Sequence, residues 1–268
     1  MRVYATYNIK GGVGKTSAAV NLAHLSAGQG QRTLLWDLDP QGAATFLFRI
    51  RAKVKGVGKG LVRGRTEVGA AIKGTDFDHL DLLPADFSYR NLDLVLDKSK
   101  RPTRRLSEVL APVAADYDIV LLDCPPSISL ASESVLDAAG TVLVPLIPAV
   151  LSVRTYQQLT AFVAKLDRRP ELIGFFSMVD GRKRLHREVA EALRAGPGRV
   201  ATAGIPAAAV VEQMAVRRLP VTASHPNSPA ARAYAELWAE VGPARPAEDT
   251  VGPARPAEDT VGPGTGPG

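Results

Sequence analysis

The chain alternates short apolar runs with segments in which apolar residues recur at helical spacing. Several runs are continuous stretches of Val, Ile and Leu, which is typical of strands covered on both faces of a parallel sheet. We expect strands at residues 2–8, 33–38, 80–84, 118–123, 141–147, 173–179 and 200–205. We expect helices at residues 15–28, 129–139, 156–166, 185–195 and 228–241. Repeated strand–helix–strand units predict a doubly wound α/β fold, with a mostly parallel sheet flanked by helices.

The C-terminal segment differs in composition from the rest of the chain. Residues 241–250 read VGPARPAEDT, and residues 251–260 repeat them letter for letter. Glycine and proline make up 12 of the 27 residues from 242 to 268. Such a segment has little to bury, and each proline removes a backbone donor. We therefore predict one folded domain over residues 1–241 and a disordered Pro/Gly-rich repeat tail over residues 242–268.

The charge balance and the cysteine count narrow the possible functions. The chain has 33 Lys and Arg against 27 Asp and Glu, a net charge of +6, and the tail contributes −2, so residues 1–241 carry +8. A basic body favours an anionic partner. One cysteine, Cys124, excludes an intramolecular disulfide and a metal site with several thiolates. We find no segment apolar enough for a signal peptide or a membrane span, and we expect a cytoplasmic protein with no membrane partner.

Residues 9–17, which read IKGGVGKTS, follow the first predicted strand directly and precede a predicted helix. The glycines permit a tight turn with inward-facing N–H groups, and the helix N-terminus adds its positive end, so the loop is suited to hold phosphates. Lys15 would reach the β- and γ-phosphates, and the Thr16 hydroxyl would ligate Mg²⁺. Ile9 stands where the ordinary pattern G-x-x-x-x-G-K-[ST] has its first glycine, and Lys10 is a second lysine in the loop.

The segment KGGVGKT at residues 10–16 resembles the deviant Walker A motif of the ParA/MinD group of P-loop ATPases. The resemblance implies ATP and Mg²⁺ as cofactors, and a phosphate-binding set of Lys10, Gly11, Gly12, Val13, Gly14, Lys15, Thr16 and Ser17. In that group the extra lysine, here Lys10, reaches the phosphates of a partner protomer in a homodimer that closes around ATP. A cation supplied in trans stabilises the transferring phosphoryl group, an effect worth about 10³–10⁵ in rate. Dimerisation is then expected to switch hydrolysis on.

Two further segments resemble motifs of the same family, in the same order along the chain. Residues 36–42, WDLDPQG, look like its second motif, in which Asp39 would orient the attacking water and Asp37 would support the Mg²⁺ shell. Residues 117–127, YDIVLLDCPPS, look like its Walker B segment, in which Asp123 contacts Mg²⁺ through water. An acid at the end of an apolar strand is costly unless it is paired or linked to a metal, which supports a ligand role for Asp123. The alternative for Asp37 and Asp39 is that they merely cap a turn.

Two other segments resemble those that line the adenine pocket of the family. They are MVDGR at residues 178–182 and GIP at residues 204–206, and they imply Met178, Asp180 and Pro206 beside the base. No N-K-x-D guanine motif occurs in the sequence, which favours ATP over GTP. The resemblance covers about residues 1–241.

Features absent from the sequence separate it from several branches of the group. It has one cysteine where iron–sulfur carriers need several, and it lacks the basic C-terminal helix of MinD-type proteins and the tyrosine-rich end of the tyrosine kinases. The phosphate loop begins at residue 10, which leaves no room for the N-terminal helix-turn-helix domain of longer plasmid partition proteins. The sequence thus looks like a short, Soj-like ParA ATPase. That implies chromosome or plasmid partitioning, nucleoid association and a ParB-like centromere-binding partner.

Such ATPases bind DNA without sequence preference, and two basic clusters are candidates for this contact. The first cluster, within residues 49–65, has no acid and consists of Arg49, Arg51, Lys53, Lys55, Lys59, Arg63 and Arg65. The second consists of Arg182, Lys183, Arg184, Arg187 and Arg194, with Arg217 and Arg218 downstream. An ordinary solvated surface is the alternative for both. The family usually has arginine after Ile-Pro, whereas alanines follow Pro206 here, so Arg217 and Arg218 are the nearest substitutes.

Two other functions stay open at this point. One is a cargo-positioning or regulatory ATPase that acts through a protein partner without touching DNA. The other is a biosynthetic P-loop enzyme such as an amidoligase, for which the sequence shows no dedicated polar pocket. Cys124 is expected to fill space in the core and not to act as a nucleophile.

Overall fold

The computed structural model describes residues 1–51, 56–196 and 198–243, apart from the side chain of residue 57. Its strands are β1 (Arg2–Thr6), β2 (Thr33–Asp37), β3 (Lys73–Gly74), β4 (Leu80–Leu83), β5 (Ile119–Asp123), β6 (Thr141–Leu146), β7 (Glu171–Val179) and β8 (Arg199–Pro206). Its α-helices are α1 (Lys15–Gly28), α2 (Ala43–Leu47), α3 (Val57–Val62), α4 (Val68–Ala71), α5 (Leu92–Leu96), α6 (Arg105–Leu110), α7 (Leu130–Ala138), α8 (Val150–Val163), α9 (Arg184–Ala195), α10 (Ala209–Glu212), α11 (Met214–Arg217), α12 (Val221–Ser224) and α13 (Pro229–Val241). Two short 3-10 helices lie at Phe87–Asn91 and Ala111–Val113.

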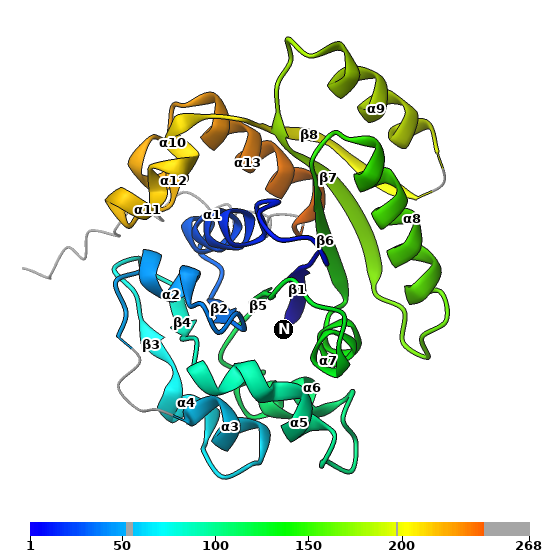
Figure 1. The fold of residues 1–268 in the computed structure, drawn as a ribbon. Coiled ribbons are helices and arrows are strands. Elements are labelled where there is room, and N and C mark those ends of the chain that lie inside the picture. The colour runs from blue at the N-terminus through cyan, green and yellow to red at the C-terminus, as the bar shows by residue number, and fades with distance from the viewer. Residues whose placement is uncertain (52–55, 197, 244–268) are drawn as a thin grey trace, which may run out of the picture.

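The described strands form one sheet in the order β3-β4-β2-β5-β1-β6-β7-β8. All neighbouring strands run parallel except β3 and β4, which are antiparallel. The chain moves outward from β1 in both directions, so helices are placed on both faces of the sheet (Figure 1). This confirms the doubly wound, mostly parallel α/β fold expected from the sequence.

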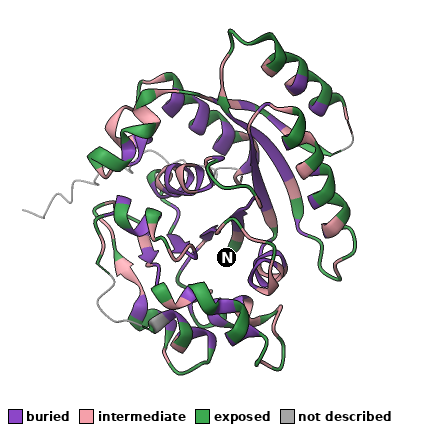
Figure 2. Ribbon diagram, in the orientation of Figure 1, coloured by how far each residue is buried: buried purple, intermediate pink, exposed green. Residues whose placement is uncertain are grey.

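Each face of the sheet carries its own apolar core. Side chains alternate along a strand, so Ile119 and Leu121 of β5 lie in one core while Val120 and Leu122 lie in the other. Helices α1, α2 and α13 cover the first face, and α5, α6, α7 and α8 cover the second. Figure 2 shows the sheet almost wholly buried, with exposed residues on the outer sides of the helices. Both strand faces are covered, which explains the uninterrupted apolar runs.

The boundaries of most long elements agree with the sequence expectations, and helix α8 is the exception. The predicted helix at 15–28 is α1, and the predicted strands end within one or two residues of those observed. Helix α8 starts at Val150, six residues before the predicted start, because the chain turns into the helix directly after β6. Helix α13 ends at Val241, where the predicted domain ends. The predicted tail lies outside the described residues, apart from Gly242 and Pro243.

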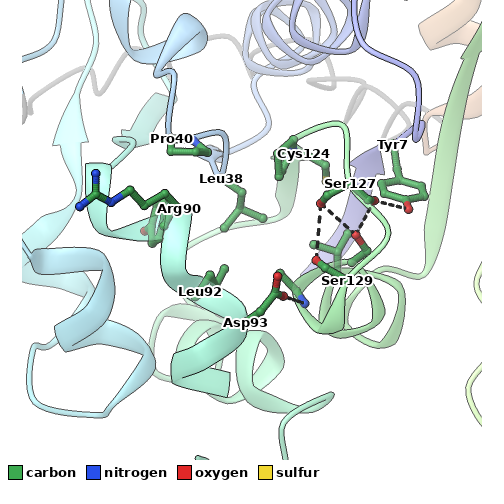
Figure 3. Close-up of a pocket in the computed structure, with 14 residues that line it drawn as sticks. Tyr7, Leu38, Pro40, Arg90, Leu92, Asp93, Cys124, Ser127 and Ser129 are labelled. Carbon is green, nitrogen blue, oxygen red and sulfur yellow. Dashed lines mark hydrogen bonds between the residues drawn. The ribbon is translucent and has the colours of Figure 1, made fainter. Parts of the chain in front are cut away.

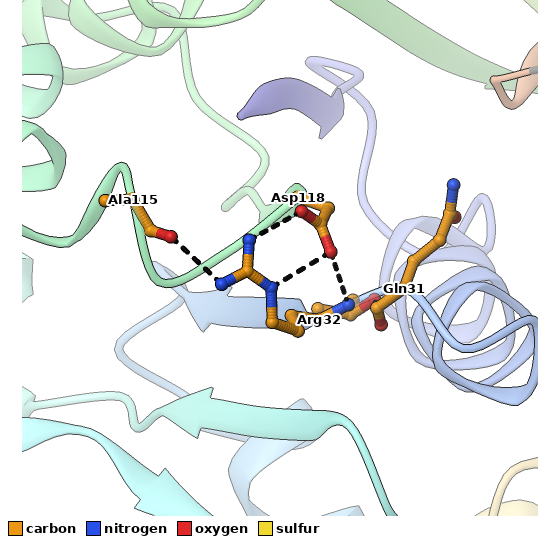
Figure 4. Close-up of polar contacts among 5 residues, drawn as sticks. Gln31, Arg32, Ala115 and Asp118 are labelled. Carbon is orange, nitrogen blue, oxygen red and sulfur yellow. Dashed lines mark hydrogen bonds and ion pairs between the residues drawn. The ribbon is translucent and has the colours of Figure 1, made fainter. Parts of the chain in front are cut away.

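The amino ends of β2 and β5 are joined by an exposed ion pair (Figure 4). The Arg32 guanidinium donates to both carboxylate oxygens of Asp118, at 2.7 and 3.2 Å, and also to the carbonyl of Ala115. The backbone N–H of Arg32 donates to the same carboxylate at 3.0 Å. These contacts hold the pKa of Asp118 down at about 2.

None of the helices described is long and apolar enough to cross a membrane.

Candidate nucleotide site

The loop between β1 and α1 is held in place by contacts from other strands. The Asn8 side chain donates to the carbonyl of Pro145 at the end of β6 (2.8 Å) and accepts from the backbone N–H of Lys10 (2.9 Å). Gly14 has a left-handed φ of 96°, and a Cβ there would lie 2.7 Å from the Ser177 hydroxyl oxygen. Both facts require glycine at position 14. The phosphate loop therefore has a shape that a larger residue would disturb.

The start of α1 leaves donors free for an anion. Helix α1 has 14 residues, Gly14 as its N-cap and no side chain that caps its first N–H groups. No acidic residue lies in its first turn. Unpaired N–H groups and the positive end of the helix dipole together favour a bound phosphate. The predicted phosphate-binding residues 10–17 all lie in this loop or the first turn of the helix.

The two lysines of the loop have different surroundings. The Lys15 side chain is buried, and its ammonium donates to the carbonyl of Lys10 at 3.0 Å. Burial lowers the pKa of Lys15, and the nearby Asp123 carboxylate partly opposes this change. The Lys10 side chain is exposed and makes no hydrogen bond or ion pair within the described residues. The Lys15 side chain is thus directed into its own loop, while the Lys10 side chain is available to a group outside the loop.

The carboxylates of Asp37 and Asp123 end two adjacent strands, and the two residues are aligned in register. Both are fully buried. Asp37 accepts hydrogen bonds from the Thr45 backbone N–H (2.8 Å), the Thr45 hydroxyl (2.7 Å) and the Asp39 backbone N–H (3.2 Å). Desolvation nevertheless raises the pKa of Asp37 to about 6. Because these three donors converge on its carboxylate, Asp37 organises the loop that follows β2.

Asp123 has no such partners. Neither of its carboxylate oxygens has a hydrogen bond of ordinary geometry within the described residues. Desolvation raises its pKa well above the usual value, the nearby Asp37 adds to the rise, and the Thr16 hydroxyl and Lys15 only partly offset it. A buried carboxylate without a partner is expensive, unless a cation or a donor completes it in the working state.

These residues fit Mg²⁺ and the phosphates of a nucleotide. Oxygen donors are what Mg²⁺ prefers, and Asp123 presents two unsatisfied oxygens next to Thr16. Asp37 lies in register beside Asp123 but has its oxygens occupied by N–H and O–H donors, so it supports the site from behind. Asp39 is half-buried and accepts the Gln41 backbone N–H at 2.9 Å, which fixes the turn in which it lies.

The predicted adenine-pocket residues lie together at the carboxyl ends of β7 and β8. Val179 and Pro206 are register partners, and the Ala207 N–H donates to the Val179 carbonyl at 3.0 Å. Met178 is 40% exposed and has a left-handed φ of 56°, which is strained for a residue with a side chain. The Arg182 guanidinium holds the pKa of Asp180 down at about 2. The edge is next to the phosphate loop, because Ser177 of β7 faces Gly14.

The basic residues proposed for DNA do not form one surface. Arg182, Lys183, Arg184 and Arg187 are exposed at the start of α9, although Arg182 and Arg184 are paired with Asp180 and Glu188. Arg217 and Arg218 belong to α11 and its end, well apart from α9 in Figure 1. Arg218 stacks on the Phe46 ring of α2, with 4.4 Å between the guanidinium carbon and the ring centroid, and donates to the Phe46 carbonyl.

Arg218 therefore lies closer to the first cluster than to the second. In the first cluster Arg49 is paired with Asp76, and Arg51 is exposed. Lys53 and Lys55 lie outside the described residues.

A cavity of about 170 Å³ lies behind the loops that follow β2 and β5 (Figure 3). Leu38 and Pro40 line it from one loop, Cys124 from the other, and the Tyr7 hydroxyl donates to the nearby Ser127 carbonyl at 2.7 Å. The Cys124 thiol is buried and its pKa is raised well above the usual value by desolvation. A thiol in this state is a poor nucleophile, in agreement with its expected role as a core residue.

Sequence reasoning missed three residues that shape the site. Thr45 holds Asp37 and also accepts the Ala85 N–H at 2.8 Å. Asn8 ties the phosphate loop to β6, and Ser177 lies against Gly14. Asn8, a polar residue two positions after the end of β1, was a usable signal. Thr45 and Ser177 gave none, because their roles depend on segments far away in the sequence.

A mostly parallel sheet with a glycine loop between a central strand and a helix, and an unsatisfied aspartate beside it, defines a P-loop nucleotide-binding protein. Residues 1–173 match the model of a family described as an AAA domain. The chain is 33% identical over 250 residues to the chromosome partitioning protein ParA of Caulobacter vibrioides, which covers 90% of this chain and 94% of that protein. It is 30% identical over 247 residues to the chromosome-partitioning ATPase Soj of Treponema pallidum, covering 87% and 94%.

A solved structure supports the same fold and nucleotide site. A cobyrinic acid a,c-diamide synthase from Mycobacterium smegmatis with a bound ATP analogue and magnesium is 28% identical, with a TM-score of 0.76 and coverage of 91% of this chain and 97% of that one. The chain belongs to the ParA-type, Soj-like partition ATPases of the deviant Walker A P-loop family. It is an ATP hydrolase, and its cofactors are ATP and Mg²⁺.

Proposed function

We propose that the protein is an ATP-dependent dimerising switch that binds DNA non-specifically and drives chromosome or plasmid partitioning. The observation that carries the proposal is the contrast between the two lysines of the phosphate loop. Lys15 is buried against its own loop, whereas Lys10 is exposed and its side chain makes no hydrogen bond or ion pair within the described residues. In the proposed dimer each protomer lends the Lys10 ammonium to the phosphates held by the other.

The proposed roles of the other residues follow from their surroundings. The loop N–H groups and Lys15 hold the phosphates, and Thr16 and Asp123 hold Mg²⁺, with Asp37 as support. Bound Mg²⁺ supplies a positive charge that neutralises the phosphate oxygens. Asp39 orients the attacking water, and the edge formed by Met178, Asp180 and Pro206 holds the adenine.

Replacing Lys10 tests the proposal directly. Lys10→Ala is expected to abolish partner-stimulated hydrolysis while nucleotide binding, measured with a fluorescent ATP analogue, stays within about twofold of the native protein. Lys15→Ala is the matched control, and it should weaken nucleotide binding itself, because its ammonium belongs to the same protomer's loop. Unchanged stimulated turnover in Lys10→Ala would remove the trans-lysine mechanism, as would a protein that stays monomeric with a non-hydrolysable analogue and Mg²⁺ in sedimentation experiments.

Non-specific DNA binding is proposed for the start of α9, where the side chains of Lys183 and Arg187 are exposed and neither is paired with an acid among the described residues. A gel shift on random duplex DNA should appear only with ATP, and it should collapse as salt rises, with a slope near −0.9 per phosphate contact. The double variant Lys183→Ala/Arg187→Ala should reduce this slope by about two per protomer. Arg154→Ala/Lys165→Ala, which removes two exposed cations elsewhere, should leave the slope unchanged.

A ParB-like centromere-binding protein is the proposed stimulating partner, and nucleoid association in cells is the proposed location. The alternative is a positioning or regulatory ATPase that uses a protein partner and never binds DNA. It predicts ATP-dependent dimers with no gel shift at any salt concentration. A fluorescent fusion would follow the nucleoid in the first case and not in the second.

The likeness to the Mycobacterium smegmatis cobyrinic acid a,c-diamide synthase supports one further candidate, ATP-dependent amide formation on cobyrinic acid. ADP release that depends on cobyrinic acid and an ammonia source would establish it. The one cysteine of the chain is buried and its pKa is raised, which is unfavourable for thiol chemistry at this site.

A further inference from the structure

A strongly basic hollow lies where α3, α5 and α6 meet, in the lower part of Figure 1 and far from α9. Its volume is about 580 Å³, within the usual range for ligand pockets. We call this cavity the basic hollow, because six cationic side chains line it: Arg63, Arg65, Lys98, Lys100, Arg101 and Arg105. Glu108 is the one acid in the described lining. These residues come from segments about 40 positions apart, so the fold, not the sequence, brings them together.

The positive charge of the hollow is largely uncompensated. Glu108 is paired with Arg105, with 2.5 Å between the guanidinium nitrogen and the carboxylate oxygen. The other five cations have no acidic partner among the residues that the structure describes, and all five are exposed. Like charges gathered around a concave surface repel one another and concentrate a positive potential there. A bound anion would relieve that repulsion.

Arg105 gives the hollow a fixed floor. Its Nε donates to the Val62 carbonyl at the end of α3, which joins α3 to α6. Gly64 has a left-handed φ of 68°, and a Cβ at that position would lie 3.0 Å from an Arg105 guanidinium nitrogen. The turn after α3 thus passes directly over the guanidinium. The Arg105 guanidinium is therefore occupied by contacts within the fold. Arg63 and Arg65 lie in the turn after α3 and remain available to bind an anion.

Ser99 adds an unpaired hydroxyl to the lining of the hollow. It lines the hollow from the loop between α5 and α6, between two of the lysines. Its hydroxyl oxygen is buried and has no hydrogen-bond partner within the described part of the chain. Buried hydroxyls in folded proteins are nearly always paired, so this one has a hydrogen bond to offer to a ligand or to water.

The chemistry of the lining favours linked phosphates over a nucleic-acid duplex. The lining, so far as the structure describes it, contains no aromatic side chain on which a base would stack. Duplex DNA presents its phosphates on a convex surface, so it would touch the rim and would not reach Ser99 or Arg105. A short chain of phosphoryl groups is compact and carries several charges, and Arg and Lys side chains are its usual partners.

We propose that the basic hollow is a second anion site, separate from the phosphate loop, that binds a compact polyphosphate group of three or more linked phosphoryls. The group is carried by a small molecule or by an inorganic polyphosphate chain. In this proposal Arg63 and Arg65 bind the polyphosphate group, so they are no longer candidates for the DNA contact considered for residues 49–65. It does not depend on dimerisation, on hydrolysis or on the DNA binding proposed above.

Calorimetric titration of the nucleotide-free, full-length protein with sodium tripolyphosphate tests the site. The native chain should bind two tripolyphosphate ions, one at the phosphate loop and one in the hollow. Lys98→Ala/Arg101→Ala removes two exposed cations without touching the Arg105 floor, and it should bind one. Arg154→Ala/Lys165→Ala removes the same charge from α8 and the turn after it, and should still bind two. Ser99→Ala should keep both sites and weaken one of them about tenfold.

A stoichiometry of two in Lys98→Ala/Arg101→Ala would overturn the proposal, and so would loss of the second site in the α8 control, which would mean a diffuse charge effect. Random duplex DNA, titrated with ATP present, is the second arm. If Lys98→Ala/Arg101→Ala weakens DNA binding and keeps two tripolyphosphate sites, the hollow belongs to DNA and the proposal is wrong. Melting curves with tripolyphosphate add a check, since a filled second site should stabilise the native chain more than the double variant.

Discussion

Strands β2 and β5 lie side by side, have five residues each, are buried along their whole length and both end in aspartate. Their carboxyl ends nevertheless behave differently. The oxygens of Asp37 accept three hydrogen bonds from Thr45 and Asp39, whereas those of Asp123 have no partner of ordinary geometry among the described residues. Burial alone therefore does not mark a functional carboxylate. Burial without partners does, because such a group is stable only when a ligand completes it.

The two aspartates therefore contribute to the site in different ways. Asp37 fixes the loop that carries Asp39, so it acts on the geometry of the site. Asp123 faces Thr16 and Lys15 and would meet the metal. Desolvation raises the pKa of both carboxyls, to about 6 for Asp37 and well above the usual value for Asp123.

The largest effect is expected for Asp123→Asn, which keeps the shape of the side chain and removes its charge. Hydrolysis of ATP should fall about 10³-fold, because the charge that faces Mg²⁺ is lost. The free energy of unfolding without nucleotide should not fall, because an unpaired buried charge is removed as well. Steady-state ADP release and urea unfolding, both on the full chain, measure the two quantities.

The same variant has a pH signature. A carboxyl whose pKa is higher in the folded than in the unfolded chain makes the protein lose stability as pH rises past about 3.9, the unfolded value. Asparagine does not titrate, so Asp123→Asn should gain stability over the native protein as pH rises from about 4 to 8. If it is instead less stable at every pH, Asp123 is a structural residue like Asp37 and the comparison fails.

A somewhat smaller effect is expected for Asp39→Asn. The amide oxygen can still accept the Gln41 N–H and keep the turn, while the carboxylate that would orient water is gone. Hydrolysis should fall about 10²-fold, with ATP affinity and ATP-dependent dimerisation unchanged. Asp39→Ala loses the turn contact too, and it is the control for geometry. Normal turnover in Asp39→Asn would assign Asp39 to the turn alone.

The long elements of this fold were predictable because their patterns are local. Helix α1 and strands β2 and β5 follow from continuous apolar runs, a glycine loop and helical spacing. Between residues 57 and 110 the sequence predicts only the strand at 80–84, because the helices of this region have four to six residues and hold too few turns for a periodic signal. Their positions depend on packing against α7 and the sheet.

The same limit applies to the site. The order of the motifs in the sequence placed Lys15, Asp37 and Asp123 together, and the structure agrees. It gave no sign that Asp37 is occupied and Asp123 is not, since Thr45 lies in a five-residue helix and its second contact, Ala85, is 40 positions away. Nor did it separate Arg218 from α9, because the stacking on Phe46 is a contact across 172 positions.

Thr45→Val tests the Asp37 side of the comparison and should act mainly on stability. It removes a donor to Asp37 and leaves the buried Ala85 N–H without its acceptor, so the free energy of unfolding should fall by about 2 kcal/mol. The pKa of Asp37 should rise further, since one of the contacts that lower it is lost. Urea unfolding measures the first effect. Thr45→Ser, which keeps the hydroxyl, should recover most of the loss, and failure to do so would mean that the methyl group matters more than the hydrogen bonds.

The smallest effect is expected at the opposite ends of the same two strands, where Arg32 and Asp118 form an ion pair with both side chains about half exposed. Solvent and salt screen such a pair, so Arg32→Ala should lower the unfolding midpoint by less than half as much as Thr45→Val. The pKa of Asp118, about 2, lies below its unfolded value, so the pair contributes stability above about pH 4 and loses it as pH falls through 2. The native and variant unfolding curves should therefore differ at pH 7 and converge toward pH 2, opposite in direction to the behaviour of Asp123→Asn. A difference that stays constant as pH falls would mean that Arg32 acts through its contact with the Ala115 carbonyl and not through Asp118.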